Sequence, residues 1–566
     1  MPQGSPRSES SERPHGATWV KELLTSVVIA FAMAFVSMAF VIRGFVIPTS
    51  SMAPTLLGAH VRITSPVSGL DWAQTPSFYA DQFRRAPLSQ QGTPSDPIVA
   101  HDPLAGPFGS GRGEVRVSGL GVRSGDRVFA LRYLPLISEP ERFDPVVFMS
   151  PTNPAENVIK RLVGLPGEQV ALADGDCFVR PGHTGEAPWT NNDWQIARKP
   201  ERLQRTLWQP VYDHSRRGGD YLLPWTGAPE AWKLDGKTVR AAGVDGARLR
   251  WDSELWPIDD GLAQNDIELR MAGASRVFQG QTYQRWQQML RTSPRYAVSD
   301  LRVSAGIAGD AQSVRFGVSA RGHEFAGELD ATGARVWMRP ASGGARQVLD
   351  EVRGNWLSDR RVRNVEFWHV DQALWLFVDG RLVAGGPEKG GYSWHPARRL
   401  EEATGLSFPN LARVDNGLIE PSATDGRSPL RRGTRVFTLA EPWVEVGGGE
   451  LDLYRFRVDR DIYWRPVMEG RGRPGRLTPG RATHPTRSPA LGPDQYFLLG
   501  DNSTDSEDGR SWGAAHPLVR DQLPHAGEGV VPRELVIGRA FVVYLPGWVK
   551  RGPAPVPLAG RVRLMP

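Results

Sequence analysis

Residues 364–383 carry the sequence NVEFWHVDQALWLFVDGRLV. Two runs rich in β-branched and aromatic residues flank the pair Asp371-Gln372, and the pair Asp379-Gly380 follows the second run. Short polar pairs between apolar runs are typical of tight hairpin turns, so this stretch predicts two successive antiparallel hairpins. For its tryptophan and histidine side chains we favour packing in a core over facing a carbohydrate.

Further strand-like runs lie on the N-terminal side of these hairpins, at Leu301–Ser304, Val314–Val318 and Arg335–Met338. Together they predict an antiparallel β-sandwich over about residues 235–440, and the Leu-Phe-Val-Asp-Gly turn resembles hairpins of concanavalin-like jelly rolls. The interval 181–490 holds 15 of the 19 tryptophans. Disordered inserts are poor in aromatic residues, so most of this interval should be folded.

Composition limits the remaining possibilities. The chain has 566 residues, which predicts two or more folded units, and 62 Gly and 47 Pro favour short strands and turns. The net charge of +6 is small for this length and does not favour a nucleic-acid partner. Cys177 is the only cysteine, which excludes an intrachain disulfide and a metal site built from cysteines.

An apolar segment lies near the N-terminus. Leu23 to Ile42 contains no charged residue, and as a helix it would span about 30 Å, the thickness of a bilayer core. We predict a transmembrane anchor over residues 20–43, preceded by a disordered tail at 1–19. The alternative is a cleavable secretory signal, which the absence of a small-x-small cleavage site disfavours.

Three sequence stretches beyond this segment carry candidate chemistry. The first, residues 45–56, reads FVIPTSSMAPTL. Ser51 lies eight residues beyond Arg43, and an extended chain of that length reaches at most about 27 Å. Chemistry at Ser51 would therefore occur close to the membrane surface, although taken alone this stretch could be an ordinary loop.

The second stretch comprises residues 144–148, DPVVF, and residues 159–168, IKRLVGLPGE. Lys160 follows an apolar run and has apolar neighbours. A lysine normally has a pKa near 10.4, and burial among apolar groups lowers it by several units. A neutral lysine can take the proton of a serine hydroxyl, whereas a solvated strand lysine would have no such role.

The third stretch, residues 496–513, reads YFLLGDNSTDSEDGRSWG. An apolar strand runs into a tight polar loop. The Asp, Asn and Ser side chains of such a loop can hydrogen-bond their own backbone, so the composition alone does not indicate chemistry.

Together these stretches resemble the type I signal peptidases. That family has an apolar anchor, a nucleophile in Ser-Met-x-Pro-Thr-Leu, a Gly-Asp strand, a base in Lys-Arg-x-Val-Gly-Leu-Pro-Gly, and a Gly-Asp-Asn loop. The Gly-Asp strand here is Gly125-Asp126-Arg127-Val128, and all the motifs occur in this order. The resemblance covers residues 45–62, 120–180 and 491–545, about a quarter of the chain.

The resemblance implies roles for individual residues. Ser51 corresponds to the nucleophile and Lys160 to the general base. The backbone N–H of Ser51 and the hydroxyl of Thr49 correspond to the two oxyanion donors. Ser506 corresponds to a hydroxyl that holds the lysine. A supporting ion-pair group is implied for Asp508, Arg510 and Arg161. The third motif departs from the family at Ser503-Thr504, where Arg-Asp is common, and at Gly509, where Ser is usual.

The expected fold is mainly β: an N-terminal transmembrane helix and a β-rich signal-peptidase-type catalytic core interrupted by inserts, one of them an antiparallel, jelly-roll-like β-sandwich. The core comprises residues 44–61, 119–180 and 491–566. The inserts comprise an unassigned segment at 62–118, a large insert at 181–465 that contains the sandwich, and a flexible basic loop at 466–490.

The predicted activity is that of a membrane-bound signal peptidase I, with a Ser51 acyl-enzyme and Lys160 as general base. By resemblance, the partners are the lipid bilayer and exported preproteins with small residues before the cut, and the location is the bacterial inner membrane with the N-terminus in the cytoplasm. No metal or cofactor is implied. One alternative is an inactive scaffold that carries a carbohydrate- or protein-binding module. The other, a self-cleaving regulator with Ser–Lys chemistry, would require a DNA-binding domain and no anchor.

Overall fold

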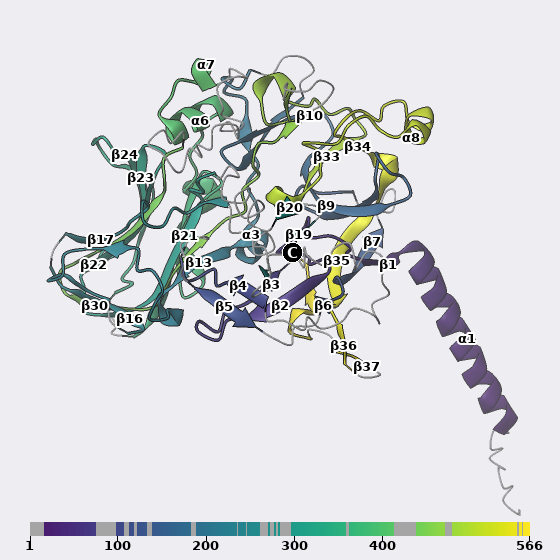
Figure 1. Ribbon diagram of the computed structural model, residues 1–566, viewed down its shortest axis with the longest axis horizontal. Coiled ribbons are helices and arrows are strands. Elements are labelled where there is room, and N and C mark those ends of the chain that lie inside the picture. The colour runs from purple at the N-terminus through teal and green to yellow at the C-terminus, as the bar shows by residue number, and fades with distance from the viewer. Residues whose placement is uncertain are drawn as a thin grey trace, which may run out of the picture.

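The structure is a computed structural model (Figure 1). It describes residues 16–74, 98–106, 113–117, 122–132, 139–182, 188–234, 236–244, 246–260, 270–271, 277–278, 281–282, 296–357, 361–411, 437–469, 478–551, 554–556 and 559–565. Most of the expected N-terminal tail, residues 1–15, lies outside these ranges. Over the described residues the chain is mainly β, with antiparallel strand pairs.

One eight-stranded antiparallel sheet unites the two ends of the chain. Its order is β1-β7-β35-β8-β9-β33-β34, with β38 paired to β35. The strands are β1 (Ile42–Val46), β7 (Arg127–Arg132), β8 (Pro145–Met149), β9 (Asn157–Gly164), β33 (Gln495–Leu499), β34 (Val531–Pro532), β35 (Val536–Leu545) and β38 (Arg563–Leu564). All three motif-bearing stretches contribute to this sheet or to loops at its ends, so it is the frame of the candidate site.

Two further antiparallel sheets form the predicted β-sandwich. In the first sheet β13 pairs with β30, and the order is β15-β16-β30-β21-β26-β27-β28; in the second it is β14-β17-β29-β22-β23-β24-β25. The strands of the first sheet are β13 (Gln209–Asp213), β15 (Trp232–Lys233), β16 (Thr238–Ala242), β21 (Leu301–Gly309), β26 (Arg363–Val370), β27 (Ala373–Val378), β28 (Arg381–Gly385) and β30 (Glu450–Arg460). Those of the second sheet are β14 (Trp225–Thr226), β17 (Ala247–Trp251), β22 (Ser313–Ala320), β23 (His323–Asp330), β24 (Gly333–Pro340), β25 (Gln347–Arg353) and β29 (Glu441–Gly447).

Both hairpins predicted from residues 364–383 are present. β26 and β27 join at Asp371 and Gln372, whose φ angles are 48° and 52°, and β27 and β28 join at Asp379 and Gly380, with φ angles of 49° and 77°. Positive φ at both central residues gives the turn a twist that matches that of paired strands. The Asp379 carboxylate also accepts a hydrogen bond from the Asn364 amide, 2.9 Å long, which secures the second turn.

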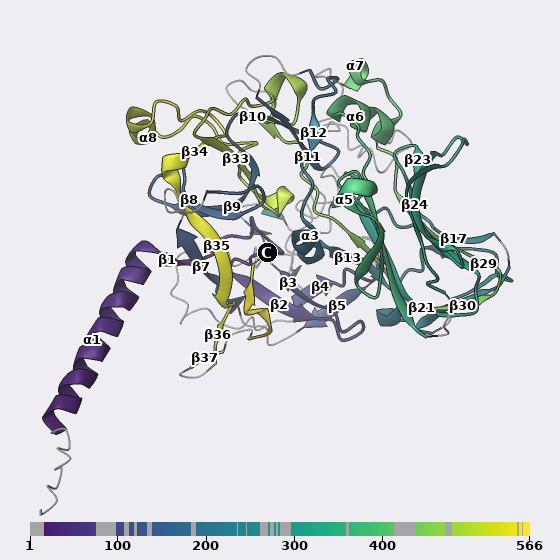
Figure 2. The ribbon, with the colours of Figure 1, turned by 180° about the vertical axis from the view of Figure 1, so that it is seen from behind.

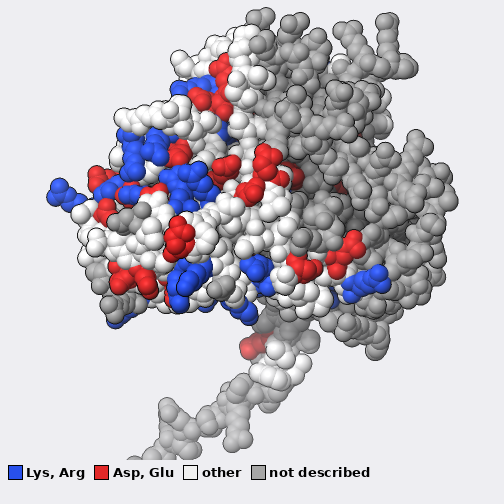
Figure 3. All heavy atoms as spheres, turned by 60° about the vertical axis from the view of Figure 1, so that its left-hand side comes forward, with Lys and Arg blue, Asp and Glu red and all other residues white. Residues whose placement is uncertain are grey.

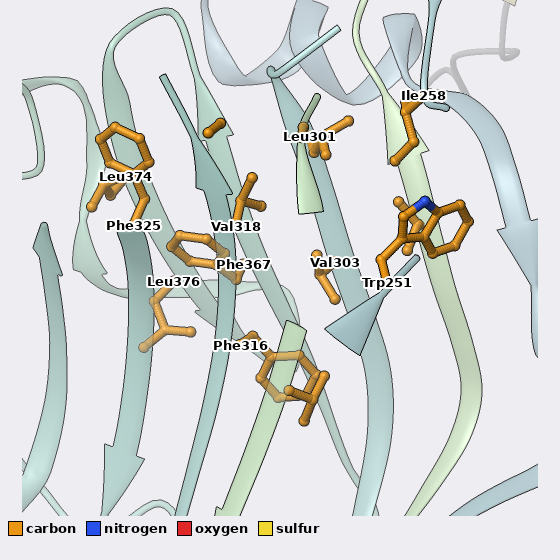
Figure 4. Close-up of a cluster of buried hydrophobic side chains, with 14 of the residues drawn as sticks. Trp251, Ile258, Leu301, Val303, Phe316, Val318, Phe325, Phe367, Leu374 and Leu376 are labelled. Atoms are coloured by element: carbon orange, nitrogen blue, oxygen red, sulfur yellow. The ribbon is translucent and has the colours of Figure 1, made fainter. Parts of the chain in front are cut away.

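The core of the sandwich lies between its two sheets. Alternate residues of facing strands point inward, because successive side chains of a strand lie on opposite faces. Figure 4 shows Phe367 and Leu376 of the first sheet opposite Phe316 and Phe325 of the second. The expectation that the tryptophan and histidine side chains are packed is confirmed, since Trp368, His369 and Trp375 are 0%, 0% and 5% exposed. His369 stacks on Phe325 of the core, whereas Trp368 and Trp375 pack with Trp208 in a separate apolar cluster on the other face of the first sheet.

The sandwich extends over about residues 209–460, more than the predicted 235–440. β30 was not foreseen because Glu450–Arg460, ELDLYRFRVDR, carries charged residues at many positions. These charged side chains alternate with buried Leu451, Leu453 and Val458, which face the core. In such a strand only about every second side chain packs in the core. The sequence therefore shows no continuous apolar run from which the strand could be predicted.

Smaller elements connect these sheets. One three-stranded sheet comprises β10 (Glu168–Ala173), β11 (Asp176–Pro181) and β12 (Gln195–Ile196). Two other three-stranded sheets include strands from the insert at 62–118. One pairs β2 (His60–Thr64) with β3 (Asp71–Gln74) and β6 (Val122–Arg123), and the other pairs β4 (Ile98–His101) with β5 (Glu114–Val117) and β18 (Arg270–Met271). The two-stranded sheets are β19 (Val277–Phe278) with β20 (Gln281–Thr282), β31 (Met468–Glu469) with β32 (Thr478–Pro479), and β36 (Val549–Arg551) with β37 (Ala554–Val556). Within the described ranges, the α-helices besides α1 are α3 (Glu201–Leu207), α5 (Gly386–Lys389), α6 (Pro396–Thr404), α7 (Phe408–Leu411) and α8 (Pro517–Gln522).

Residues 478–490, part of the stretch in which we expected a flexible basic loop, pack on the catalytic core. Ala482 and His484 are 0% and 2% exposed. The carbonyl of Ala482 accepts from the Leu172 amide of β10 at 2.6 Å, and that of Pro489 accepts from the Val170 amide at 3.1 Å. The many prolines and arginines of this stretch led us to predict a linker. Backbone hydrogen bonds to β10 instead hold residues 478–490 in place.

Helix α1 (Gly16–Phe40) extends away from the rest of the molecule (Figures 1 and 2). Its side chains are described for residues 19–33, and large apolar ones such as Leu24, Val28 and Phe31 are 59%, 65% and 65% exposed. Among the described residues, no helix has both the length and the apolar character needed to cross a membrane. The transmembrane anchor predicted at 20–43 is therefore not confirmed.

Charged side chains of both signs are intermingled on the face shown in Figure 3. On the second sheet of the sandwich they form cross-strand pairs, such as Arg248 with Glu324 at 2.7 Å and Arg315 with Glu328 at 3.0 Å. Opposite charges on neighbouring strands stabilise the pairing. The described part of this face carries no uniform field of one sign that would attract a polyanion.

Candidate active site

Ser51 lies on a buried turn that follows β1. The Ala53 amide donates to the Ser50 carbonyl at 2.8 Å, and the Leu56 amide donates to the Met52 carbonyl at 2.9 Å. Met52 and Leu56 are fully buried in the apolar cluster beneath the eight-stranded sheet that contains β1 and β9, called the catalytic sheet below. Burial of these two side chains holds the turn on the sheet. Ser51, which directly precedes Met52, is 7% exposed.

Lys160 lies on β9, a strand of the middle of the catalytic sheet. It pairs with Val146 of β8, and its side chain is nearly buried, at 4% exposure. Its Nζ donates a hydrogen bond to Ser506 Oγ, 3.1 Å away. Burial lowers the pKa of Lys160 from 10.5 to about 8; the nearby Asp508 carboxylate opposes this change and the Arg510 guanidinium reinforces it.

The catalytic loop, defined here as residues 500–511, contacts both Ser51 and Lys160. The Asn502 amide donates to the Ser51 carbonyl at 3.0 Å. Gly500 lies beside both groups: a Cβ at this position would be 2.2 Å from Ser506 Oγ and 2.5 Å from the Ser51 carbonyl oxygen. Only a glycine permits this approach, because any side chain would displace Ser506, the hydrogen-bond partner of Lys160.

Thr49 lies beside the candidate nucleophile. Its Oγ1 is 3.3 Å from Ser51 Oγ, so the two hydroxyls share one hydrogen bond. This position agrees with the hydroxyl that the resemblance implies near the nucleophile. The role of Thr49 as an oxyanion donor stays a prediction, as do the chemical roles of Ser51 and Lys160.

The predicted supporting group is divided between two ion pairs. Asp508 and Arg510 form a fully buried bidentate pair, with Arg510 Nε–Asp508 Oδ1 at 2.8 Å and Arg510 Nη2–Asp508 Oδ2 at 2.7 Å. Arg161, which we expected in the same group, instead pairs with Asp501 at 2.6 and 2.5 Å. β9 directs Lys160 and Arg161 to opposite faces, so the two adjacent residues have different partners.

Asp501 is a site residue that the sequence did not single out. Besides Arg161, its carboxylate accepts from the Thr55 hydroxyl at 2.5 Å, so it joins the Ser51 turn to β9. Asp505 similarly accepts from the Ser50 hydroxyl. Both lie in the third motif, whose many acidic residues gave no means of telling which of them would face the other two motifs.

The departures from the family motif have local explanations. The Ser503 Oγ accepts from Arg510 Nη1 at 2.6 Å and from the Arg465 amide at 2.9 Å, so Ser503 orders the loop. A Cβ at Gly509 would lie 2.7 Å from the Phe497 ring and 2.9 Å from the Gly529 carbonyl oxygen. The usual serine would therefore not fit here without displacing its neighbours.

The two histidines nearest to the motifs in sequence have other partners. His60 is fully buried, and its Nδ1–H donates to the Gly58 carbonyl at 2.8 Å. Burial lowers the pKa of His60 to about 4, so its ring is neutral at physiological pH. His516 accepts from the Leu518 amide at the start of α8.

The chain matches one known protein family, described as "Signal peptidase, peptidase S26", over residues 20–211 and 467–545. The matched parts contain all three motifs, and the intervening region contains most of the sandwich. No protein with a curated description matches the chain.

Several solved structures show a remote similarity. They include the carbohydrate-binding module CBM66 from Bacillus subtilis, at 11% identity over 42% of this chain and 94% of that chain, with a TM-score of 0.18. A β-glucanase of Bacillus licheniformis has 8% identity over 43% and 95%, with a TM-score of 0.22. The galectin LEC-6 of Caenorhabditis elegans has 8% identity over 29% and 81%, with a TM-score of 0.15. At such TM-scores these similarities support no conclusion about fold or ligand.

Proposed function

We propose that this chain, which matches the signal peptidase family, peptidase S26, over residues 20–211 and 467–545, is a membrane-bound type I signal peptidase. It would hydrolyse the signal peptide from exported preproteins. The observation that carries this proposal is the buried Lys160 amine, whose pKa is lowered to about 8 and which contacts Ser506 in the loop that also holds the Ser51 carbonyl. A buried lysine with a lowered pKa beside a serine nucleophile is the arrangement that Ser–Lys catalysis requires.

The proposed reaction is acyl transfer through Ser51. Its Oγ attacks the scissile carbonyl carbon while its proton passes to the neutral Lys160 amine. The Ser51 N–H and the Thr49 hydroxyl would stabilise the oxyanion, each donor contributing a few kcal/mol. Lys160 then gives the proton to the leaving amine, the peptide bond breaks, and a water activated by the same amine releases the acyl chain and restores Ser51.

The proposed substrate is the extended end of a signal peptide with small residues at the first and third positions before the cut. β1 is an edge strand of the catalytic sheet and leads directly into the Ser51 turn. An extended peptide could add to such an edge by main-chain hydrogen bonds, with pockets for alternate side chains giving specificity. This arrangement would place the scissile bond beside Ser51.

The proposed location is the bacterial inner membrane, with residues 20–43 as anchor and the folded domains on the outer face. The exposed apolar side chains of α1 and the uncharged sequence from Leu23 to Ile42 support it. Protease added to intact spheroplasts should digest the bulk of the chain. Protection of that bulk would contradict both the orientation and the proposed function.

A glycan ligand for the sandwich, the basis of the alternative binding-module function, has little support in the packing. Its tryptophans among the described residues are buried or half-buried, as with Trp337 and Trp443 at 1% exposure. The Arg248 guanidinium covers the Trp443 ring, 3.9 Å from its centroid. Sugar-binding surfaces need an accessible aromatic face, so peptidase activity remains the proposed function.

The test is cleavage of a model preprotein by the purified full chain. Ser51→Ala should abolish cleavage and leave the fold intact, because the substitution removes only one hydroxyl. Ser50→Ala is the matched control: it removes the neighbouring hydroxyl, which contacts Asp505, and should still cleave at the same position. An active Ser51→Ala with an inactive Ser50→Ala would show that the nucleophile is misassigned.

A further inference from the structure

The segment that leaves the β-sandwich passes directly to the catalytic loop. β30 ends at Arg460, and Trp464 follows, 2% exposed. The indole Nε1–H of Trp464 donates to the Gly500 carbonyl at 3.1 Å, while its backbone N–H donates to the Gly175 carbonyl at 3.1 Å. The first bond fixes the peptide plane between Gly500 and Asp501, and Gly500 is the position that the Ser51 carbonyl and the Ser506 hydroxyl approach most closely.

Arg465 continues the contact with the same loop. Its amide donates to Ser503 Oγ at 2.9 Å, and its carbonyl accepts from Arg510 Nη1 at 2.9 Å. Its guanidinium donates to Asp260 Oδ2 at 2.8 Å, which connects it to the segment after β17 of the sandwich. Backbone atoms of Arg465 therefore touch two loop residues while its side chain is held by the insert.

A buried network of charges holds the start of this segment. The Asp461 amide donates to the Asp300 carbonyl at 3.0 Å, and its carboxylate pairs with Lys199 at 3.0 Å and accepts from Gln204 at 2.8 Å. Burial in an ion-pair network makes a segment costly to displace, because any movement leaves a charge unpaired.

The same network joins the sandwich to the hairpin between β10 and β11. The carboxylates of Asp176, Asp300 and Asp371 lie within 4.8 Å of one another. Three cations contact these carboxylates: Lys199, Arg321 and Arg399. The acidic cluster is thus accounted for by ion pairs between structural units, and the junction is rigid because each partner is fixed by at least one other.

We propose that Trp464 and Arg465 are positioning residues for the active site: through them, the inserted β-sandwich holds the catalytic loop in the arrangement in which Ser506 contacts Lys160. Both residues lie between the two parts of the chain that match the peptidase family, so the insert supplies this support. The inference rests on the proposed function. It makes the sandwich a structural part of the catalytic site.

Trp464→Phe is the sharpest variant, because it keeps an aromatic ring and removes the donor to Gly500. We expect kcat for a model preprotein to fall about tenfold, with KM changed less than about twofold, since loop order affects the chemical step more than binding. Water would reach Lys160 more easily, so its pKa should rise from about 8 toward 10.5, and the midpoint of the rise in activity with pH should move up.

The matched control is Trp251→Phe. Trp251 is equally buried, and its indole N–H also donates to a backbone carbonyl, that of Trp256 at 2.7 Å, but within the sandwich. This variant should lose a similar amount of thermal stability and retain kcat and the pH profile. Equal losses of activity in the two variants would overturn the proposal, as would an unchanged Trp464→Phe.

A second measurement does not depend on activity. Hydrogen–deuterium exchange of the full chain should show faster exchange of the Asn502 and Gly509 amides in Trp464→Phe, by at least about tenfold, and no change in Trp251→Phe. Unchanged exchange would overturn the proposal. If wild-type protein cleaves no preprotein, the proposed function fails while this measurement still decides whether the insert orders the loop.

If Trp464→Phe does not fold, the Ser503→Ala variant provides the test of the contact between the insert and the catalytic loop. It removes the loop hydroxyl that binds the Arg465 amide, and should lower kcat and raise the midpoint of the rise in activity with pH, as for Trp464→Phe. A folded Ser503→Ala with wild-type kcat, pH profile and amide exchange would overturn the proposal.

Discussion

Changing the pH tests the assignment of Lys160 as general base. Burial lowers its pKa from 10.5 to about 8. At pH 7 about one molecule in ten would then hold a neutral amine, against about one in three thousand for an unperturbed lysine. The burial of this one side chain therefore makes the neutral base about 300-fold more abundant.

The assay is kcat/KM for a model preprotein, measured from about pH 6 to about pH 10. Because the base is active when neutral, kcat/KM should rise about tenfold per pH unit at the acid end and level off above the pKa of about 8. Lys160→Arg should be inactive at every pH, since a guanidinium keeps its proton. Folded His60→Ala and His516→Ala variants should keep this rise in kcat/KM with pH.

Two results would refute this reasoning. A midpoint near 10.5 would mean that Lys160 is solvated in the working enzyme. A midpoint near 6.5 that disappears in a histidine variant would assign the base to that histidine, although the lowered pKa of His60, about 4, argues against its titration in this range. An active Lys160→Arg would leave Ser51 without the proposed partner.

Three further predictions concern stability, each measured as the free energy of unfolding. Asp501→Asn leaves the buried Arg161 guanidinium without its carboxylate partner and should lower the free energy of unfolding by about 3 kcal/mol. Asp452→Asn, which removes the charge from the exposed pair with Arg240, should change it little. Equal effects of the two variants would contradict the importance of burial. Lys160→Met should stabilise the fold by up to about 3 kcal/mol at pH 7. The pKa of Lys160 is about 8 in the folded state and 10.5 in the unfolded state, so burying the charged amine destabilises the fold. This destabilisation is fully present below pH 8 and is lost above about pH 10.5. An unchanged stability at pH 7 would show that the amine is solvated. Gly509→Ser should destabilise by about 1–3 kcal/mol, because its Cβ would meet the Phe497 ring, and a neutral effect would mean that the loop can move aside.

Local sequence patterns were sufficient where a structure depends on neighbouring residues. The turns at Asp371-Gln372 and Asp379-Gly380 could be predicted because their backbone conformation suits those residues and the flanking runs pair locally. The strand that carries Lys160 could be predicted from its apolar residues. Ser51 and Lys160 could be named because each lies in a motif a few residues long.

The strands at the boundary of the sandwich were harder to predict. β13 to β17 are short, and the charged face of β30 obscures its apolar face. Their stability comes from pairing with strands far away in the sequence, as between β16 and β30. Propensity within such a strand is therefore a weak guide, since the partner strand supplies most of the burial.

The sequence by itself determined the family, the mainly β composition, the hairpins of the insert and the residues proposed to react. Only the tertiary structure decided which side chains meet: that Arg161 pairs with Asp501 rather than Asp508, that Ser506 contacts Lys160, and that Trp464 reaches Gly500. Lys160 and Ser506 are separated by 346 positions. Contacts at such separation depend on the register of the sheet and on how the insert packs against it, and neither is encoded in any short stretch of the chain.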